Sequence, residues 1–293
     1  MHTLFVVFII VVGGNILNVN YCCCFENLLC LLDVVSILLE YLMIESIINI
    51  CLQAGRKVMQ VYDGEKVFHC NKKKDDTPVT SADLFANDII IARLENLTPE
   101  IPILSEENCS LWVYHKEVDS FWVVDPLDGT KEFLSHNYEF TVNIALIEHG
   151  RPVMGVIYAP AFGILYAAVN GQAWKMNVNT QYCVKISAHH SYPPVIVISR
   201  FHNDLRQLQN YLMKFMHYRI ITVGSSLKFC LLAEGVVQVY PRFSFMHIWD
   251  IAAGHAIAEA AGAIINDWSG APLVYYGKVC SSFMYSGFCA SVV

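Results

Sequence analysis

The sequence has few basic residues for its length, and this limits what the protein can bind. Its 19 Lys and Arg residues oppose 26 Asp and Glu residues among 293 in total, which gives a net charge of −7 at pH 7. Proteins that bind nucleic acid carry a basic patch or stripe, whereas the balance here is acidic. The composition excludes a nucleic-acid-binding class and favours a small-molecule partner, with a metal ion bridging an acidic site.

Paired cysteine motifs are also missing. The chain contains 11 Cys residues, an odd number, and no Cys-x-x-Cys pair. A zinc ribbon needs such pairs and a disulfide framework needs an even count, so both are excluded. We interpret the cysteines as buried thiols of a protein in a reducing cytosol.

The N-terminal segment has no Lys or Arg before Arg56. A secretory signal begins with basic residues, and a membrane-spanning helix needs about 20 apolar residues in succession. Polar residues interrupt both apolar runs of this segment: Asn15, Asn18, Asn20, Glu26, Asp33 and Glu40. We expect residues 1–42 to be an extension outside the catalytic fold, with Met43 as an alternative start. The expected location is cytoplasmic, with at most a weak peripheral association with the cytoplasmic face of the inner membrane.

Residues 43–182 are expected to form an α+β half that carries the metal site. Apolar residues at near-helical spacing predict a helix over 43–61. Thr80 and Asp83 have the spacing of a capping box at the start of a second helix. The buried stripe of that helix is expected to consist of Leu84, Ile91, Leu94 and Leu97.

Strands are predicted after these two helices. A short strand at 101–104 and a buried strand that ends near Asp125 precede three alternating segments, at 140–148, 152–159 and 164–169. The dipeptides His149-Gly150 and Asn170-Gly171 are typical of tight hairpin turns. The pattern predicts an antiparallel meander that closes the first half near residue 182.

Residues 183–293 alternate between strands and helices. Strands are predicted at 195–199, 220–223 and 236–240, with helices at 204–216, up to Ala233, and from Trp249 to Gly262. Alternation of this kind is typical of a layered α/β unit. The second half is therefore expected to be the smaller α/β part that binds phosphate or a nucleotide.

The segment from Phe121 to Thr130 begins as a buried strand and ends with Asp125, Asp128, Gly129 and Thr130. Two buried like charges are costly unless a divalent cation lies between them, and the carboxylates with the Leu127 carbonyl are hard oxygen ligands. We therefore predict a metal site. The alternative is that Asp-Pro and Asp-Gly are ordinary turn residues with solvated carboxylates.

Three further carboxylates lie at the ends of regular elements. Asp83 begins a helix, Glu106 follows a strand, and Asp250 begins another helix. Each has a simpler explanation: a helix cap, a surface pair with Glu107, or a favourable charge on a helix dipole. Taken with Asp125 and Asp128, however, they suit two or three Mg²⁺ ions and the hydrolysis of a phosphate ester.

Other residues suit the handling of water and phosphate. Thr130 and Thr80 are candidates for orienting the attacking water, and Glu106 or Asp83 for taking its proton. A Gly-Ser-Ser turn and two cations offer a second phosphate site, formed by Ser225, Ser226, Lys228 and Arg242. Either cation could instead be a solvated surface charge.

Several of these segments resemble the inositol monophosphatase superfamily. The similarity rests on Pro78–Asp83, Leu104–Glu107, Trp122–Phe133 and Trp249–Gly254. Within the superfamily, the segments 125–133, 224–230 and 240–243 are similar to those of bacterial 3′(2′),5′-bisphosphate nucleotidases. The resemblance covers roughly residues 43–268.

The resemblance implies an αβαβα layered sandwich and Mg²⁺-dependent removal of the 3′-phosphate from adenosine 3′,5′-bisphosphate, in sulfur assimilation or nucleotide recycling. The implied metal ligands are Glu106, Asp125, the Leu127 carbonyl, Asp128 and Asp250, with Asp83 near the water. The implied contacts of the scissile phosphate are Leu127, Asp128, Gly129 and Thr130, beside Glu106 and Asp250. Ser225, Ser226, Lys228 and Arg242 match the region that holds the other phosphate.

Two departures and two alternatives accompany this interpretation. The extension before Met43 and the segment 274–287 differ from the family pattern. The same carboxylates would also serve an inositol monophosphatase or a fructose bisphosphatase, and the Lys228 and Arg242 pair is what favours a bisphosphate nucleotide. A non-catalytic phosphate-binding protein is the alternative from another class, and the complete set of carboxylates argues against it.

Overall fold

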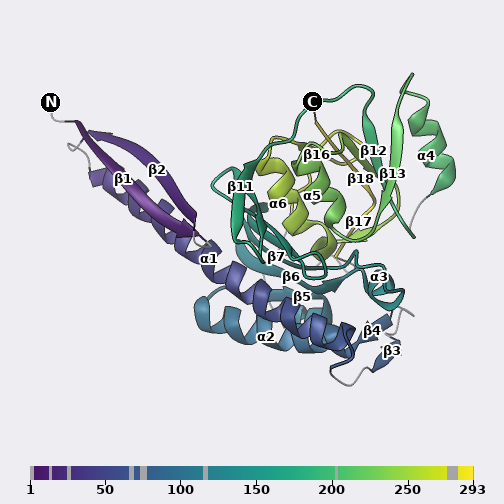
Figure 1. Ribbon diagram of the computed structural model, residues 1–293, viewed down its shortest axis with the longest axis horizontal. Helices are drawn as coiled ribbons and strands as arrows, with labels where there is room; N and C mark the ends of the chain where they lie inside the picture. The colour runs from purple at the N-terminus through teal and green to yellow at the C-terminus, as the bar shows by residue number, and fades with distance from the viewer. Residues whose placement is uncertain are drawn as a thin grey trace.

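The computed structural model describes residues 3–12, 15–24, 28–65, 69–72, 78–114, 118–201, 204–275 and 283–292. Within them, helical and sheet layers alternate (Figure 1). Helices α1 (Leu28–Tyr62) and α2 (Ser81–Leu97) cover one face of a seven-stranded sheet. Helices α5 (Leu227–Ala233) and α6 (Ala252–Ala260) lie between this sheet and a five-stranded one. Because α4 (Leu205–Leu212) packs on the outer face of the second sheet, the predicted αβαβα sandwich is confirmed.

The seven-stranded sheet has the order β11-β10-β9-β8-β7-β6-β5 and is antiparallel except for the parallel pair β5–β6. Its strands are β5 (Ile103–Ser105), β6 (Ser120–Asp128), β7 (Thr141–Glu148), β8 (Arg151–Ala159), β9 (Ile164–Val169), β10 (Gln172–Asn177) and β11 (Tyr182–Ile186). The turns His149-Gly150 and Asn170-Gly171 have positive φ at both positions, as type I′ hairpins require. The predicted meander is confirmed.

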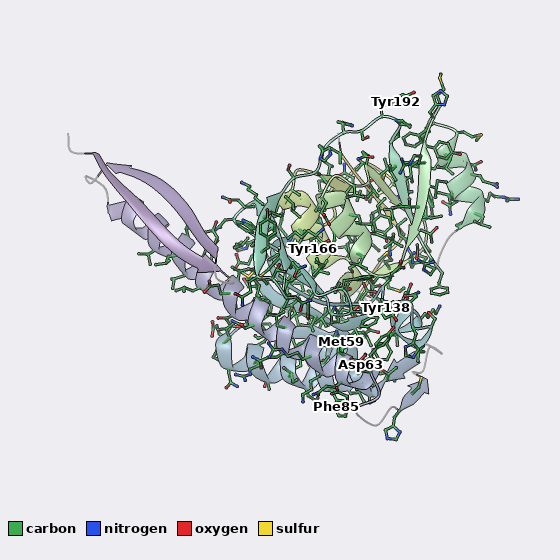
Figure 2. All side chains as sticks on the ribbon, viewed as in Figure 1. Met59, Asp63, Phe85, Tyr138, Tyr166 and Tyr192 are labelled. Carbon is green, nitrogen blue, oxygen red and sulfur yellow. The ribbon has the colours of Figure 1, made fainter. Side chains whose placement is uncertain are left out.

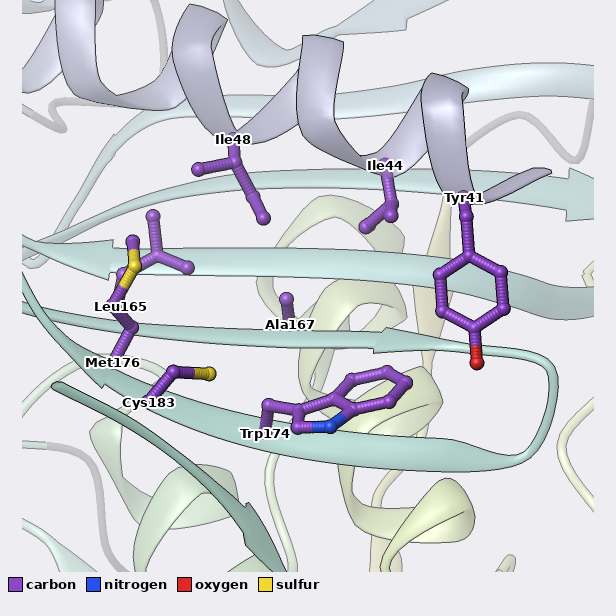
Figure 3. Close-up of a pocket in the computed structure, with 8 residues that line it drawn as sticks. All are labelled: Tyr41, Ile44, Ile48, Leu165, Ala167, Trp174, Met176 and Cys183. Atoms are coloured by element: carbon purple, nitrogen blue, oxygen red, sulfur yellow. The ribbon is translucent and has the colours of Figure 1, made fainter. Parts of the chain in front are cut away.

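Helix α1 begins at Leu28 rather than near Met43. Its apolar face continues through Tyr41, which is buried and packs edge-on against Trp174 with ring centroids 6.1 Å apart. These rings and Ile44 border a small apolar pocket between α1 and the sheet (Figure 3). The expected start relied on a change in composition, whereas the apolar helical stripe runs through that change.

By length and composition, Ile37–Tyr62 of α1 could cross a membrane. The same stretch supplies Ile47, Cys51 and Val58, which are fully buried against the sheet or α2. A core helix of a globular fold has this combination of apolar length and burial. Ahead of α1, β1 (Thr3–Val12) pairs with β2 (Asn15–Cys24), and this hairpin extends from the body beside the start of the helix (Figure 1).

The expected buried stripe of α2 is wrong at three of its four positions. Leu94 is buried, but Leu84 and Leu97 are exposed and Ile91 is only partly buried. The inward face is instead formed by Ala82, Ala86, Asn87, Ile90 and Leu94. Small residues face inward because they let α2 approach its neighbours closely, and this leaves larger apolar side chains on the outside.

The five-stranded sheet has the order β13-β12-β14-β18-β16. Its strands are β12 (Val195–Ser199), β13 (Arg219–Val223), β14 (Val239–Arg242), β16 (Ile264–Asn266) and β18 (Phe288–Ser291). Strand β14 starts later than predicted and α4 ends earlier, at Leu212. Strand β18 inserts between β14 and β16, so the last described residues complete the sheet despite the divergent segment before them.

The remaining elements are β3 (Cys70–Lys72), β4 (Pro78–Thr80), the 3₁₀ helices η1 (Glu106–Tyr114) and η2 (Ile248–Asp250), α3 (Thr130–Leu134), β15 (Met246–His247) and β17 (Met284–Tyr285). A polar link at Tyr166, which is labelled in Figure 2, joins the seven-stranded sheet to α5. The Tyr166 hydroxyl donates to Glu234 Oε1 at 2.5 Å, and Lys175 Nζ donates to Glu234 Oε2 at 2.6 Å. This link holds the end of α5 against β9 and β10.

Candidate metal centre and phosphate-binding residues

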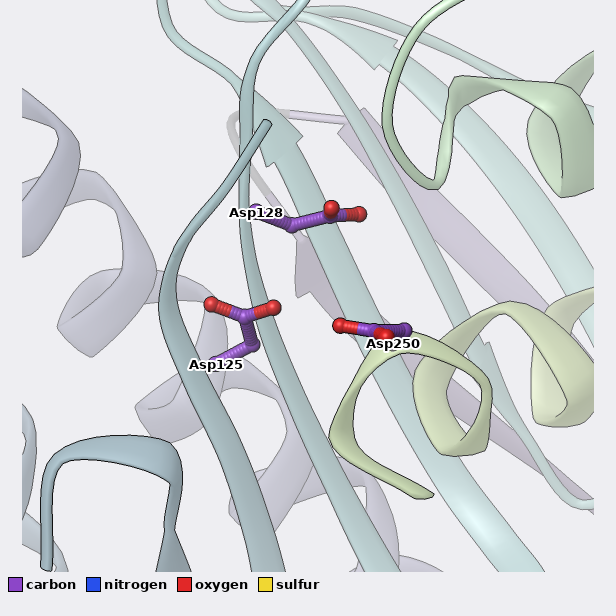
Figure 4. Close-up of side chains that lie close together, drawn as sticks. All are labelled: Asp125, Asp128 and Asp250. Carbon is purple, nitrogen blue, oxygen red and sulfur yellow. The ribbon is translucent and has the colours of Figure 1, made fainter. Parts of the chain in front are cut away.

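Strand β6 ends in two aspartates that face the same centre. In a regular strand, side chains three residues apart point to opposite faces of the sheet. The pairing of β6 with β7 shifts register between Asp125 and Asp128, around Pro126, which cannot donate a ladder hydrogen bond. A bond from Leu127 N to Asp125 Oδ1 (3.1 Å) fixes the turn. The irregularity thereby allows both carboxylates to converge (Figure 4).

Asp250 reaches this centre from the second half of the chain, at the end of η2. Its Oδ2 accepts a hydrogen bond from His247 N at 3.2 Å. One carboxylate oxygen from each of Asp125, Asp128 and Asp250 lies within 4.8 Å of the others. Burial raises the pKa of Asp250, and the charges of Asp128 and Glu106 raise it further. These three residues, called here the three-aspartate centre, need a cation among them to remain ionised together.

Asp83 is both a helix cap and a neighbour of the turn at Thr130. Its Oδ2 accepts hydrogen bonds from Thr80 N (2.8 Å) and Thr80 Oγ1 (2.6 Å), which confirms the predicted capping box. Its Oδ1 lies 3.5 Å from Thr130 Oγ1. Burial raises the pKa of Asp83 to about 7, against the lowering effect of the Thr80 hydrogen bonds. Such a carboxyl group can take up or release a proton near neutral pH.

Glu106 follows β5, whose parallel pairing with β6 brings the carboxyl ends of both strands to one edge. Its charge raises the pKa of Asp83 and of Asp250, so it lies close to both. Its side chain is partly exposed, and it is not one of the three residues of the three-aspartate centre. The structure therefore gathers all five predicted carboxylates in one region, with three of them in close contact.

The Gly129 turn brings the two halves together. Gly129 has φ +89°, and an added Cβ would lie 3.1 Å from the Glu139 carbonyl oxygen and 3.2 Å from Ser225 Cβ. Only glycine fits this conformation and this spacing without strain. The turn therefore sets Thr130 and the start of α3 against the Gly224–Ser226 segment of the second half.

The two predicted cations are buried rather than solvated. Lys228 Nζ donates to the carbonyl oxygens of Val223 (3.3 Å) and Ser225 and lies 5.5 Å from the centre of the Tyr240 ring. Burial lowers the pKa of Lys228 to about 8, and the charge of Asp128 opposes that shift. Arg242, on β14, is also buried, and its charge lowers the pKa of both Lys228 and Asp250. These two residues, called here the cationic pair, thus adjoin the three-aspartate centre.

Ser225 and Ser226 differ in what they contact. Ser225 has φ +47°, and its Oγ accepts a weak bond from Leu227 N at 3.4 Å. Ser226 Oγ instead donates to Asp128 Oδ2 at 2.6 Å. The hydroxyl of Ser226, predicted as a phosphate contact, is therefore engaged with a carboxylate in this structure.

The sequence reasoning missed three polar residues beside these groups. Asn143 contacts Asp128 and Ser226, Glu132 is buried under Gly224, and Glu139 accepts from Gly224 N at 2.7 Å. Arg200 forms a two-pronged hydrogen bond with Glu139, at 2.8 Å from Nη2 to Oε1 and 3.1 Å from Nε to Oε2. The only sequence signal for Asn143 was a lone amide in an otherwise apolar strand.

The donor atoms fit a hard divalent cation. All are oxygens, from carboxylates and a main-chain carbonyl, as Mg²⁺ prefers. Main-chain hydrogen bonds hold Asp125 and Asp250, and Asp125 is buried while Asp128 and Asp250 are partly buried. Three like charges this close together are unfavourable without a positive charge between them. We infer that Asp125, Asp128 and Asp250, with the Leu127 carbonyl and Glu106 close by, can hold such ions.

A layered α/β fold with carboxylates at one sheet edge, beside a buried cationic pair, defines a class of phosphate-handling enzymes. A profile of the inositol monophosphatase family matches residues 42–283, and the chain belongs to that family. Within it, the chain is 46% identical over 250 residues to the 3′(2′),5′-bisphosphate nucleotidase CysQ of Escherichia coli (strain K12), covering 85% of this chain and 100% of the relative. The CysQ of Buchnera aphidicola subsp. Acyrthosiphon pisum is 47% identical over 251 residues, covering 86% and 94%.

Solved structures agree with this assignment. The crystal structure of CysQ from Bacteroides thetaiotaomicron matches with a TM-score of 0.72 and 36% identity, over 84% of this chain and 96% of that one. An inositol monophosphatase of Thermotoga maritima matches with a TM-score of 0.67 at 24% identity, which supports the fold alone. The fold is thus shared beyond the nucleotidases.

Proposed function

We propose that this protein is a 3′(2′),5′-bisphosphate nucleotidase, which hydrolyses the 3′-phosphate of adenosine 3′,5′-bisphosphate to give AMP and inorganic phosphate. The observation that carries the proposal is the contact between two clusters of opposite charge. The three-aspartate centre suits the cations that bind a scissile phosphate, and Lys228 with Arg242 suits a second phosphate nearby. The identity to curated bisphosphate nucleotidases supports this choice within the family.

In this proposal, the metal ligands are Glu106, Asp125, the Leu127 carbonyl, Asp128 and Asp250, for two or three Mg²⁺ ions. When bound, Mg²⁺ supplies positive charge that stabilises the phosphoryl group in the transition state. The chain's own part is to hold these oxygens in a fixed arrangement, through the turn at Leu127 and the bond from His247 N to Asp250. Fixed charges of this kind need no reorganisation during the reaction.

The attacking water is assigned to Thr130 and Asp83. Thr130 Oγ1 lies 3.4 Å from the Leu127 carbonyl oxygen and 3.5 Å from Asp83 Oδ1. A water beside this pair can form hydrogen bonds with both side chains. A pKa of about 7 lets the Asp83 carboxylate accept the proton of that water near neutral pH. Glu106 is the second candidate acceptor.

The positive φ of Gly129 opens the turn so that residues 127–130 can approach the scissile phosphate. The phosphate that is not cleaved is assigned to Ser225, Lys228 and Arg242. A buried ammonium and a buried guanidinium strengthen binding of an anion because little water screens them. Ser226, whose hydroxyl already bonds to Asp128, is the least direct of the predicted phosphate contacts.

Two other functions remain to be tested against this one. An inositol monophosphatase-like polyol phosphatase would use the same carboxylates, and a phosphate-binding protein would use the cations without turnover. Phosphate release from adenosine 3′,5′-bisphosphate, inositol 1-phosphate and fructose 1,6-bisphosphate separates the three. We expect the highest kcat/KM for the bisphosphate nucleotide. A preference for inositol 1-phosphate, or no release from any substrate, would contradict the proposal.

We place the enzyme in the cytoplasm, with any weak contact with the cytoplasmic face of the inner membrane confined to residues 1–42. A chain that starts at Met43 tests this, because it lacks the hairpin and the first turns of α1. We expect full activity and a lower Tm, since the buried contact of Tyr41 with Trp174 is lost. Full-length Tyr41→Ala is the matched control for the Tm, and fractionation of cells making each form measures membrane association.

A further inference from the structure

We infer that Asn143 and Ser226 are positioning residues that fix which oxygen of Asp128 is available to a bound cation. The inference rests on the proposed metal-dependent function of the three-aspartate centre. It extends that function to two residues that are not metal ligands. One of them, Asn143, comes from β7 in the first half, and the other, Ser226, stands at the start of α5 in the second half.

The hydrogen bonds of the pair converge on one oxygen of Asp128. Ser226 Oγ donates to Asp128 Oδ2 at 2.6 Å, while Asn143 Nδ2 lies 2.9 Å from Ser226 Oγ and 3.3 Å from Asp128 Oδ2. Because these two acceptors are so close together, one amide hydrogen of Asn143 is shared between them. Ser226 Oγ also lies 3.1 Å from the Asp250 carbonyl oxygen, but the single hydroxyl hydrogen prefers the shorter, charge-assisted bond.

Both bonds to Asp128 end on Oδ2. Among the contacts of the described residues, Oδ1 receives no such bond, so its lone pairs stay available for a ligand. Partners of this kind orient a carboxylate and prevent its rotation. The pair therefore decides which face of Asp128 is turned toward Asp125 and Asp250.

The placement of Asn143 supports a role for its amide nitrogen. Asn143 is 1% exposed and lies directly opposite Asp125 in the β6–β7 ladder, between apolar residues of a core strand. Its Oδ1 is buried and has no hydrogen-bond partner within the described ranges. A buried amide oxygen without a partner is destabilising, and an apolar side chain would avoid that. The hydrogen bonds of the amide nitrogen with Asp128 and Ser226 explain why an amide occupies this position.

The inference is tested by measuring Mn²⁺ binding in the absence of substrate. Electron paramagnetic resonance measures this binding as the loss of the free-ion signal. Ser226→Ala removes one oxygen atom, and Asn143→Leu removes the amide at similar volume. We expect each to raise the Kd for Mn²⁺ by about 10- to 100-fold, the usual effect of losing a partner of a metal ligand. In the double variant the Kd for Mn²⁺ should rise by less than the product of the two single effects, because the residues act through one network.

Thr141→Val is the matched control. Thr141 lies on the same strand, pairs with Asp128 in the ladder, and is fully buried with a hydroxyl that has no partner in the described part of the chain. Removing that hydroxyl should leave the Kd for Mn²⁺ unchanged. Circular dichroism and the Tm without metal show whether Asn143→Leu still folds. If Asn143→Leu does not fold, the Kd of Ser226→Ala for Mn²⁺ decides the outcome.

An unchanged Kd for Mn²⁺ in Ser226→Ala, with a higher KM for adenosine 3′,5′-bisphosphate, would overturn the inference and make Ser226 a substrate contact. A wild-type protein that binds no Mn²⁺ would overturn it as well. Failure of the proposed function has a different signature: Mn²⁺ binds and Ser226→Ala weakens it, but no phosphate is released from the bisphosphate. In that case the positioning role is supported and only the substrate is wrong.

Discussion

The two halves of the molecule bring charges of opposite sign to one place. The first half supplies Asp125 and Asp128 from the end of a strand. The second half supplies the cations Lys228 and Arg242 from α5 and β14, together with Asp250 from η2. Burial raises the pKa of the acidic Asp83 and lowers that of Lys228. The shifts have opposite signs because burial disfavours whichever form is charged.

The difference between these regions lies in how each charge is compensated within the chain. Lys228 is compensated by main-chain carbonyl oxygens and the neighbouring carboxylates. The carboxylates of the three-aspartate centre accept hydrogen bonds from neutral groups, and their oxygens lie within 4.8 Å of one another. Asp128 raises the pKa of Lys228, and Arg242 lowers that of Asp250, so the clusters act on each other across the boundary between the halves. The like charges of the acidic centre therefore need added positive charge, and those of the cationic pair suit an added anion.

The largest effect is expected when a charge is removed from the acidic centre. Asp250→Asn or Asp125→Asn should lower phosphate release by more than about a hundredfold, the scale of losing a preorganised electrostatic group. The Tm without metal should not fall, because repulsion between carboxylates is relieved. Phosphate release at saturating Mg²⁺, with a thermal scan of the same samples, measures both. Near-normal turnover in either variant would contradict the metal centre.

Removing one charge of the cationic pair should act selectively. Lys228→Ala or Arg242→Ala should lower kcat/KM for adenosine 3′,5′-bisphosphate about 10- to 100-fold more than for adenosine 3′-monophosphate. The reason is that a charge-assisted bond to phosphate contributes about 1.5 to 3 kcal/mol, at tenfold for each 1.4 kcal/mol. Equal losses on both substrates would show that these residues do not recognise the second phosphate.

A smaller effect is expected in the pH dependence of stability. The pKa of Lys228 is about 8 in the folded protein against 10.5 ordinarily. Between these two pKa values the unfolded chain binds more protons than the folded chain, so the free energy of unfolding rises with pH. The cost of burying the charged ammonium is present in full below pH 8 and disappears as the pH rises. Wild type should therefore gain stability across this window relative to Lys228→Met. Urea unfolding measures the gain, and Lys214→Met, at an exposed lysine, should behave as wild type.

The smallest effect concerns the link between the halves. Arg200→Ala removes the bond to Glu139, a partly exposed ion pair worth about 0.2 to 1 kcal/mol. We expect a loss of stability in that range and little change in kcat. Glu139→Gln keeps an oxygen that can accept a hydrogen bond from Gly224 N but removes the charge. This variant therefore distinguishes the contribution of the ion pair from that of the main-chain hydrogen bond. A large loss of kcat in Arg200→Ala would mean that this link positions the site as well.

The sequence predicted best what is decided locally. Strands β7, β8 and β9 were located within a residue or so, because alternation and positive-φ turn dipeptides act over a few neighbours. The stripe of α2 was predicted wrongly because close packing placed Ala82 and Ala86 inward, and small residues give no strong periodic signal. The start of α1 was missed because a change in composition does not end an apolar helical face.

The parts of the site that depend on local sequence were also predictable, and the others were not. Asp125 and Asp128 stand close together in the sequence, and the Thr80 and Asp83 pair is a recognisable cap. Their meeting with Asp250 depends on how the two halves pack, which no local pattern contains. The burial of Lys228 and the engagement of Ser226 with Asp128 also depend on tertiary contacts.

The register shift in β6 has a consequence for the order of folding. Asp125 and Asp128 are placed by pairing with the next strand in the chain, opposite Asn143 and Thr141, which needs only a short loop to close. Asp250 arrives much later in the sequence and joins only when η2 docks. A cation that requires all three carboxylates therefore binds only the docked state, and at a hundredfold excess over its Kd it would stabilise that state by about 2.7 kcal/mol. The ion would act as a folding ligand as well as a cofactor.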